Sequence, residues 1–143
     1  MAETENEILV GSCLCGSVRF EVRGPFKLFQ YCHCSRCQKA TGSAHAANLF
    51  VDSSQFTWLS GEDSLVRYRL EGAKHFGTVF CRDCGASLPW QTADGATTLV
   101  PAGGLDQPPS ERPIQSIHWA SRAEWYLSPD HLPQHAELPP RRK

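Results

Sequence analysis

The sequence of 143 residues has no long apolar run, no surplus of charge of either sign and no internal repeat. A helix that crosses a bilayer needs about 20 consecutive apolar residues, and no segment approaches that length. The segment from Met1 to Glu7 is acidic and lacks the basic and apolar regions of a signal peptide. The net charge of −1 gives no basic surplus for nucleic acid or an anionic membrane. We therefore expect a cytoplasmic protein with neither kind of partner.

Length and composition fit one globular domain followed by a tail. Hydrophobic residues make up 41% of the chain and charged residues 20%, which is typical of a folded, soluble protein. A chain of 143 residues allows one modest core, and no central linker divides it. The last stretch is rich in proline. We therefore predict a domain over residues 8–127 and an extended or frayed tail over residues 128–143.

The apolar pattern predicts a mainly β fold with little helix, in which antiparallel sheets are joined through metal-bearing turns. Short alternating runs are bounded by Gly, Pro, Asp and Ser, which is typical of strands. One segment differs, because Ser35 is a capping residue before RCQKAT and Gly42 follows it as a stop. We predict one or two helical turns there. The predicted strands cover residues 18–22, 44–50, 66–70, 76–80, 97–101 and 114–119.

Seven cysteines are the strongest signal in the sequence. In a reducing compartment such a set is more typical of metal ligands than of disulfides, and an odd number leaves one thiol unpaired. Cys15 and Cys84 are each followed by glycine, which allows a tight turn whose backbone amides point at the sulfurs. We predict a closed, structural zinc site, the alternative being ordinary buried cysteines or a redox pair. Its ligands would be Cys13, Cys15, Cys81 and Cys84.

The other three cysteines, Cys32, Cys34 and Cys37, form a CxCxxC motif. Three protein ligands and one open position are typical of catalytic zinc, so we predict a second zinc here, labile or catalytic. Cys37 lies near the predicted helix start, where free amides favour a thiolate and an anion such as a substrate carboxylate. Alternatively, His33 or His45 closes this site. Alternation in an extended segment would point His33 away from the cysteines.

Five polar residues are candidates for binding a substrate. Four lie beside the three-cysteine motif, and the fifth belongs to the late HW dipeptide. Each also has an ordinary explanation as a solvated or charge-balancing side chain, as helix surface or as a core histidine. The candidates are Ser35, Arg36, Gln38, Lys39 and His118.

The sequence resembles the glutathione-dependent formaldehyde-activating enzyme family, also represented by centromere protein V, in five successive segments: GSCLCGSVRFEV, YCHCSRCQKATGS, FCRDCGASL, AGGLD and HWASRAEW. The resemblance spans about Gly11 to Trp125. It implies a β-tent fold of antiparallel sheets held by a structural zinc. It also implies that formaldehyde is joined to glutathione, which in reverse is a carbon–sulfur lyase reaction. The implied ligands are Cys13, Cys15, Cys81 and Cys84 for structural zinc, and Cys32, Cys34 and Cys37 for a second zinc.

These observations favour a zinc-dependent carbon–sulfur lyase that acts on a small thiol or thiol adduct, with glutathione and an aldehyde such as formaldehyde as the implied substrates. One alternative is a non-catalytic, zinc-stabilised binding module, for which the near-neutral charge offers little support. Another is a redox or metal-buffering protein whose middle thiols cycle. The sequence carries no indication of an oligomeric state.

Overall fold

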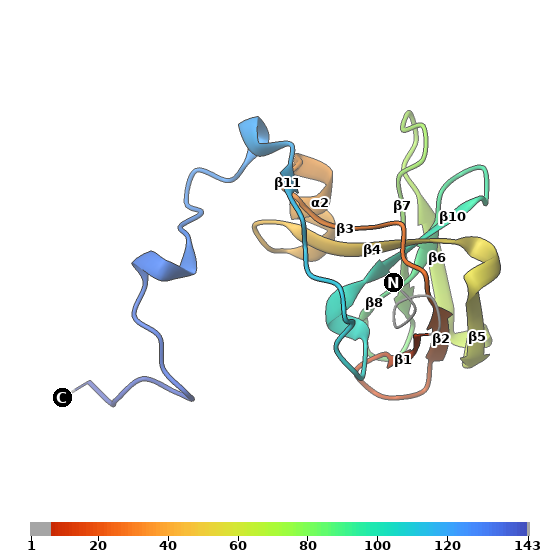
Figure 1. The fold of residues 1–143 in the computed structure, drawn as a ribbon, viewed down its shortest axis with the longest axis horizontal. Coiled ribbons are helices and arrows are strands. Elements are labelled where there is room, and N and C mark those ends of the chain that lie inside the picture. The colour runs from red at the N-terminus through yellow and green to blue at the C-terminus, as the bar shows by residue number, and fades with distance from the viewer. Residues whose placement is uncertain (1–6, 143) are drawn as a thin grey trace.

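The computed structural model describes residues 7–142, in which three small sheets surround one core and one α-helix lies beside them (Figure 1). Paired strands are antiparallel, except that β11 runs parallel to β3. The first sheet has the order β1 (Ile8–Ser12), β2 (Arg19–Arg23), β5 (Phe56–Ser60). The second has the order β11 (Ser116–Ile117), β3 (Leu28–Cys32), β4 (Ala46–Asp52), β10 (Thr97–Pro101), β9 (Trp90–Gln91). The third has the order β6 (Leu65–Arg69), β7 (Gly77–Cys81), β8 (Ser87–Leu88).

The core lies between the sheets, where alternate residues of each strand are buried. In β2, Phe20 and Val22 are fully buried while their neighbours face outward, as the period of two requires. The ring of Phe20 stacks on Phe56 of β5, with centroids 5.6 Å apart, and meets Trp58 edge-on at 6.1 Å. Leu49 of β4 is also fully buried. Removal of each such side chain from water contributes about 2 kcal/mol. This packing fixes the turns that carry the cysteines.

The predicted mainly β fold is confirmed, and each predicted strand has a counterpart in the structure. Residues 97–101 form β10 as predicted, and most of the others begin within two residues of their predicted starts. The strand predicted over residues 114–119 is limited to Ser116–Ile117. The reason is that His118 takes a left-handed backbone conformation with a φ of 54°, and Trp119–Ser121 then forms a 3-10 helix.

The predicted helix is also present, as α2 (Ser35–Thr41), but its cap is not Ser35. Cys34 has an extended backbone, and its Sγ accepts a hydrogen bond from the amide of Cys37 at 3.4 Å. Ser35 is therefore the first helical residue, because the sulfur of a candidate ligand does the capping. The predicted end is correct, since Gly42 has a φ of 65° and its amide donates to the carbonyl of Gln38 at 2.8 Å.

The C-terminal segment leaves the sheets beside β11 and extends away from them (Figure 1). In residues 127–142 the hydrogen bonds of the described chain are local, such as those that close the 3-10 helix Pro129–His131. The predicted division at residues 127 and 128 remains a prediction. Within residues 7–142, no helix combines the length and apolar character needed to span a membrane.

Candidate metal centres and substrate pocket

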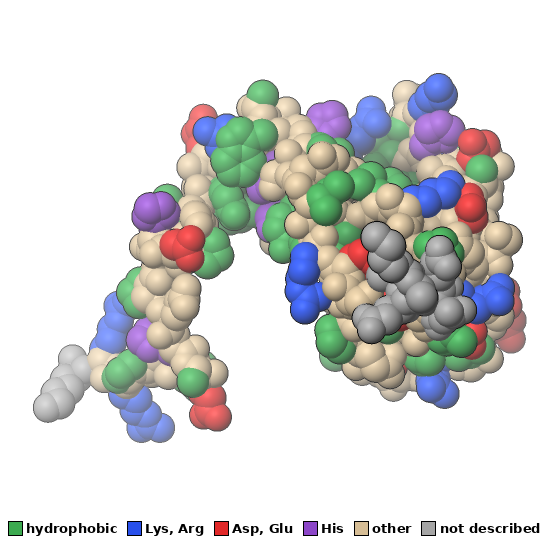
Figure 2. All heavy atoms as spheres, in the orientation of Figure 1, with side chains coloured by type: hydrophobic (Ala, Val, Ile, Leu, Met, Phe, Trp, Pro, Cys, Tyr) green, Lys and Arg blue, Asp and Glu red, His purple; other side chains and the backbone are tan. Residues whose placement is uncertain are grey.

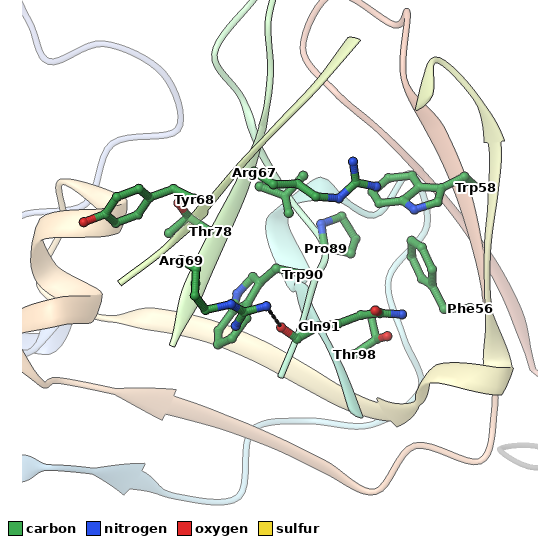
Figure 3. Close-up of a pocket in the computed structure, with 12 residues that line it drawn as sticks. Phe56, Trp58, Arg67, Tyr68, Arg69, Thr78, Pro89, Trp90, Gln91 and Thr98 are labelled. Carbon is green, nitrogen blue, oxygen red and sulfur yellow. Dashed lines mark hydrogen bonds between the residues drawn. The ribbon is translucent and has the colours of Figure 1, made fainter. Parts of the chain in front are cut away.

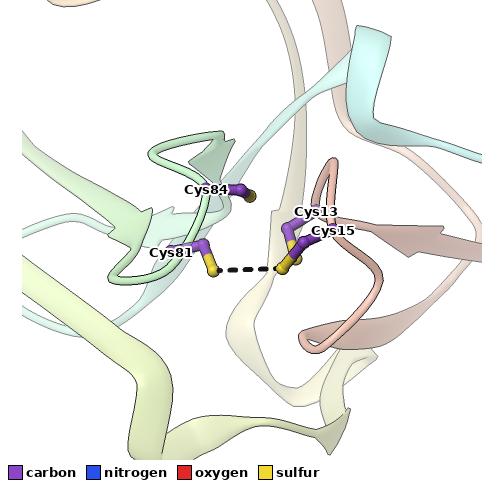
Figure 4. A group of neighbouring side chains, drawn as sticks. All are labelled: Cys13, Cys15, Cys81 and Cys84. Carbon is purple, nitrogen blue, oxygen red and sulfur yellow. Dashed lines mark hydrogen bonds between the residues drawn. The ribbon is translucent and has the colours of Figure 1, made fainter.

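Four cysteine sulfurs converge from two turns that are far apart in sequence (Figure 4). Cys13 and Cys15 follow β1, while Cys81 ends β7 and Cys84 lies in the next turn. All four sulfurs lie within 4.8 Å of one another. The distance from Cys15 is 3.6 Å to Cys13 and 3.9 Å to Cys81. Four sulfurs at about 2.3 Å from a tetrahedral ion would be separated by about 3.8 Å, so this group fits a metal ion.

Glycine makes both of these turns possible. Gly16 has a φ of 82° and donates its amide to the carbonyl of Cys13 at 3.1 Å. Gly85 has a φ of 75° and donates to the carbonyl of Cys81 at 2.8 Å. A Cβ atom at either glycine would have no heavy atom within 4 Å, so backbone conformation rather than crowding requires glycine. The two glycines identified in the sequence therefore close turns of different length, with amide bonds to the carbonyl three residues back at Gly16 and four residues back at Gly85.

Hydrogen bonds favour the thiolate form of two cysteines in this group, Cys13 and Cys81. Burial raises the pKa of Cys13, but donors that include the Val18 amide and the Ser17 hydroxyl outweigh it and lower this pKa to about 6. The backbone amide of Cys84 lowers the pKa of Cys81. The Ser17 oxygen lies 3.2 Å from the sulfur of Cys15 and 3.6 Å from that of Cys81. Sequence reasoning missed Ser17, whose only signal was its position two residues after Cys15.

The second group consists of Cys32 at the end of β3, Cys34 as the helix cap and Cys37 in the first turn of α2. The three sulfurs lie within 4.8 Å of one another. A hydrogen bond from Cys37 is the largest of the causes that lower the pKa of Cys32 to about 5, and the same bond raises the pKa of Cys37. The Cys32 thiolate is thus stabilised by the neighbouring thiol of Cys37. The group can hold a metal ion through three ligands.

Neither His33 nor His45 joins this group in the described chain, where the metal-compatible atoms are the three sulfurs alone. His33 is fully buried on the other side of the strand, as alternation predicts. Its ring lies 5.0 Å from that of His45 and 5.0 Å from Trp119. Tyr126 closes the aromatic cluster at 5.3 Å from His33. These histidines therefore pack in an aromatic cluster.

A cavity of about 220 Å³ opens beside the three-cysteine group. His118 and Arg36 lie in its wall with the three cysteines, and Phe76 and Trp90 provide apolar surface. The positive-φ backbone of His118 is uncommon for a residue other than glycine, and such conformations concentrate at functional sites. A second hollow of about 260 Å³ shares Arg36 and Phe76 and adds Lys39. The two hollows together form one candidate substrate surface.

The structure thus brings three of the five substrate candidates to this surface and uses the other two elsewhere. Arg36, Lys39 and His118 line the two hollows. Gln38 instead donates through Nε2 to the carbonyl of His33 at 2.8 Å and to that of Ser121 at 3.0 Å. Ser35 is exposed and lines neither hollow. Sequence reasoning missed the buried polar side chains of Gln30 and Asn48, which also face the cavity.

Comparison with known proteins gives a consistent result. A family model described as "Glutathione-dependent formaldehyde-activating enzyme" matches residues 8–121. A Halomonas elongata protein named "Putative glutathione-dependent formaldehyde-activating enzyme" is 36% identical over 85 residues, which cover 57% of this chain and 54% of that protein. The match therefore spans about half the length of this curated relative. A crystal structure of a Rhodobacter sphaeroides protein is similar with a TM-score of 0.58 and 25% identity, covering 75% of this chain and 98% of that chain.

Proposed function

Because the chain belongs to the glutathione-dependent formaldehyde-activating enzyme family, we propose that it is a zinc-dependent enzyme that joins a small thiol to an aldehyde, with glutathione and formaldehyde as substrates. The observation that carries this proposal is the contrast between the two cysteine groups. The four-sulfur group has a full set of ligands for a tetrahedral ion. The three-sulfur group offers one ligand fewer and opens into a cavity. We therefore place the catalytic reaction at the three-sulfur group.

The donor sets support zinc as the metal in both places. Thiolate sulfur is a preferred ligand of zinc. The sulfur separations of 3.6 and 3.9 Å in the four-sulfur group suit its bond lengths, and the three sulfurs of the other group lie within 4.8 Å of one another. In this proposal Cys13, Cys15, Cys81 and Cys84 hold a structural zinc, and Cys32, Cys34 and Cys37 hold a labile or catalytic one. Zinc bound by three thiolates supplies a stabilised substrate thiolate or a polarised carbonyl.

The wall of the substrate surface suits a thiol that carries carboxylates. Arg36 belongs to both hollows, and Lys39 lies one helical turn further along the exposed side of α2. Within residues 7–142 neither side chain forms an ion pair. A peptide thiol can therefore place its sulfur at the cysteine group and a carboxylate at these cations, which would fix its orientation. Phe76, shared by both hollows, would cover its apolar part.

In the proposed reaction the thiol sulfur attacks the carbonyl carbon of the aldehyde. A carbon–sulfur bond forms and the carbonyl π bond breaks. The thiol proton ends on the new hydroxyl oxygen, so no oxidant or reductant is needed, and the reverse reaction is that of a carbon–sulfur lyase. His118 is the histidine in the cavity wall, and its charge favours the thiolate of Cys32. We assign His118 the transfer of this proton.

Zinc analysis and a product assay test the proposal together. We expect two zinc ions per chain, and X-ray absorption at the zinc edge should change when glutathione is added. Carbon-13 NMR with labelled formaldehyde should show S-hydroxymethylglutathione forming faster with enzyme than without it. If zinc is bound but glutathione leaves the absorption spectrum unchanged and no rate enhancement appears, the enzyme proposal is wrong and a zinc-stabilised binding module is the better description.

A further inference from the structure

An aromatic groove whose lining includes no cysteine lies where edge strands of all three sheets meet (Figure 3). β5, β6 and β9 are each the last strand of their sheet, so each has one edge without a partner strand in residues 7–142. Phe56 and Trp58 line the groove from β5, and Trp90 lines it from β9. The cavity between them measures about 380 Å³. Aromatic walls between open strand edges are suited to binding an extended peptide.

Two arginines of β6 line this groove, and they differ in their hydrogen bonding. The guanidinium of Arg69 donates to the carbonyls of His75 at 2.6 Å and Gln91 at 3.0 Å, so it braces the wall. Arg67 is exposed and has neither a hydrogen bond nor an ion pair from its side chain in the described part of the chain. Arg67 and Trp58 both line the groove. The groove therefore presents one free positive charge next to aromatic rings.

The C-terminal arm, residues 128–142, has the matching properties. It contains four prolines and exposes Leu132 at 49% and Leu138 at 89%. Figure 2 shows hydrophobic side chains along this arm, which extends away from the globular part of the molecule. Its acidic residues are Asp130 and Glu137, and Arg141 and Arg142 at its end balance their charge. Proline-rich segments favour the extended polyproline II conformation, which binds aromatic-lined grooves at a small entropic cost.

We propose that the arm of a second copy of this chain docks in the groove between β5, β6 and β9. The prolines and the two leucines would lie against the aromatic rings, and an acidic side chain of the arm would pair with Arg67. In Figure 1 the arm leaves beside β11 and α2 and points away from β5 and β6. A reciprocal exchange of arms gives a closed dimer with two identical contacts. Self-association is thus a property of the groove and the arm. Because Trp90 lines both the groove and the cavity beside the three-cysteine group, the test measures dimerisation and not activity.

Sedimentation velocity of the full-length chain over a wide concentration range tests this. We expect a reversible monomer–dimer equilibrium. The double variant Leu132→Ser, Leu138→Ser and the single variant Arg67→Glu should each weaken dimerisation by about tenfold or more, as loss of an interface anchor does. Ile114→Ser is the matched control, since Ile114 is 70% exposed in the segment before β11 and lies outside both surfaces. It should leave dimerisation unchanged.

A charge exchange makes the test specific. Glu137→Arg should weaken dimerisation, and combining it with Arg67→Glu should restore part of the loss. Circular dichroism and zinc content should be the same in every variant, because every changed side chain is exposed and none belongs to a cysteine group. A monomer at all concentrations would overturn the proposal, as would a dimer that is insensitive to both the arm and Arg67. Arm-dependent tryptophan fluorescence in a strictly monomeric protein would show that each arm binds its own groove, which also overturns it.

Discussion

The side-chain amide of Gln38 on α2 donates a hydrogen bond of 3.0 Å to the carbonyl oxygen of Ser121, 83 residues later. The same nitrogen donates to His33, between two of the cysteines, at 2.8 Å. One side chain therefore joins the helix that carries Cys37 to the 3-10 helix Trp119–Ser121, which directly follows His118. This bond fixes the distance between the cysteine group and the far wall of the cavity.

Gln38→Glu tests that relationship, because a carboxylate keeps the shape of the side chain but cannot donate to either carbonyl. We expect a loss of about 1–3 kcal/mol in unfolding free energy and a lower kcat with unchanged zinc content. Gln55→Glu is the control, since Gln55 likewise donates to two carbonyls, those of Arg23 and Pro25, each at 2.7 Å. This control variant should lose a similar amount of unfolding free energy, measured by urea unfolding, and should keep its full kcat. An equal fall of kcat in both variants would refute the positioning role.

Replacement of single cysteines should separate the two metal sites. Cys34→Ser keeps an oxygen that can cap α2 but weakens one of three ligands. We expect turnover to fall by more than about 100-fold, since groups that merely orient metal ligands are worth about 10- to 100-fold. The melting temperature should fall by only a few degrees. Cys84→Ser, from the four-sulfur group, should instead unfold the chain or lower its melting temperature sharply. Equal loss of fold in both variants would contradict the assignment.

The glycine in the second metal-bearing turn should matter for metal retention as well as for stability. Gly85→Ala places a Cβ atom on a backbone with a φ of 75°, at a cost of about 1–2 kcal/mol. Gly72→Ala has the same kind of cost at a φ of 81°, in the hairpin between β6 and β7. We expect both variants to unfold at lower urea concentration. Only Gly85→Ala should speed the release of zinc to a chromophoric chelator, and equal rates would show that this turn does not control the metal.

Arg36 should act on substrate affinity rather than on the chemical step. With glutathione, we expect Arg36→Gln to raise KM by about tenfold to 100-fold, which corresponds to one charge-assisted hydrogen bond, with little change in kcat. A thiol without a carboxylate, such as cysteamine, serves as the control substrate. Its KM should be the same for both proteins. A fall in kcat that is equal for the two thiols would place Arg36 in the chemistry or in the charge balance of the cysteine group instead.

Much of the fold could be predicted from sequence because alternation is strong in strands with one buried face, such as β2 and β7. β3 was missed because its apolar residues do not alternate: Phe29 and Gln30 are adjacent and both are buried. Gln30 is satisfied by Gln115, whose amide donates to it at 2.8 Å across 85 residues. Such a contact depends on tertiary structure and leaves no local signal. β1 was missed because Ile8, Leu9 and Val10 are apolar in succession, and β5 was missed although its residues alternate, because none of them is fully buried.

Both cysteine groups could be predicted because ligand spacing is local, whereas the substrate wall could not. Nothing in the sequence near Gln38 indicates that its amide is used 83 residues away. The left-handed conformation of His118 was equally invisible, since the pattern around it reads as a strand. The helix cap was misplaced by one residue because serine is the commoner cap and the capping role of the Cys34 sulfur depends on the local fold.

Connectivity also sets when each cysteine group becomes complete during synthesis of the chain. Cys32, Cys34 and Cys37 are present within a stretch of six residues, so their motif is available to metal as soon as that stretch leaves the ribosome. Cys15 and Cys81 are 66 residues apart, so the other group forms only after most of the sheets have been made. Bringing the Cys13–Cys15 turn and the Cys81–Cys84 turn together closes a long loop. The packing of the sheets offsets the entropic cost of that closure. The proposed structural ion would therefore be the later one to bind.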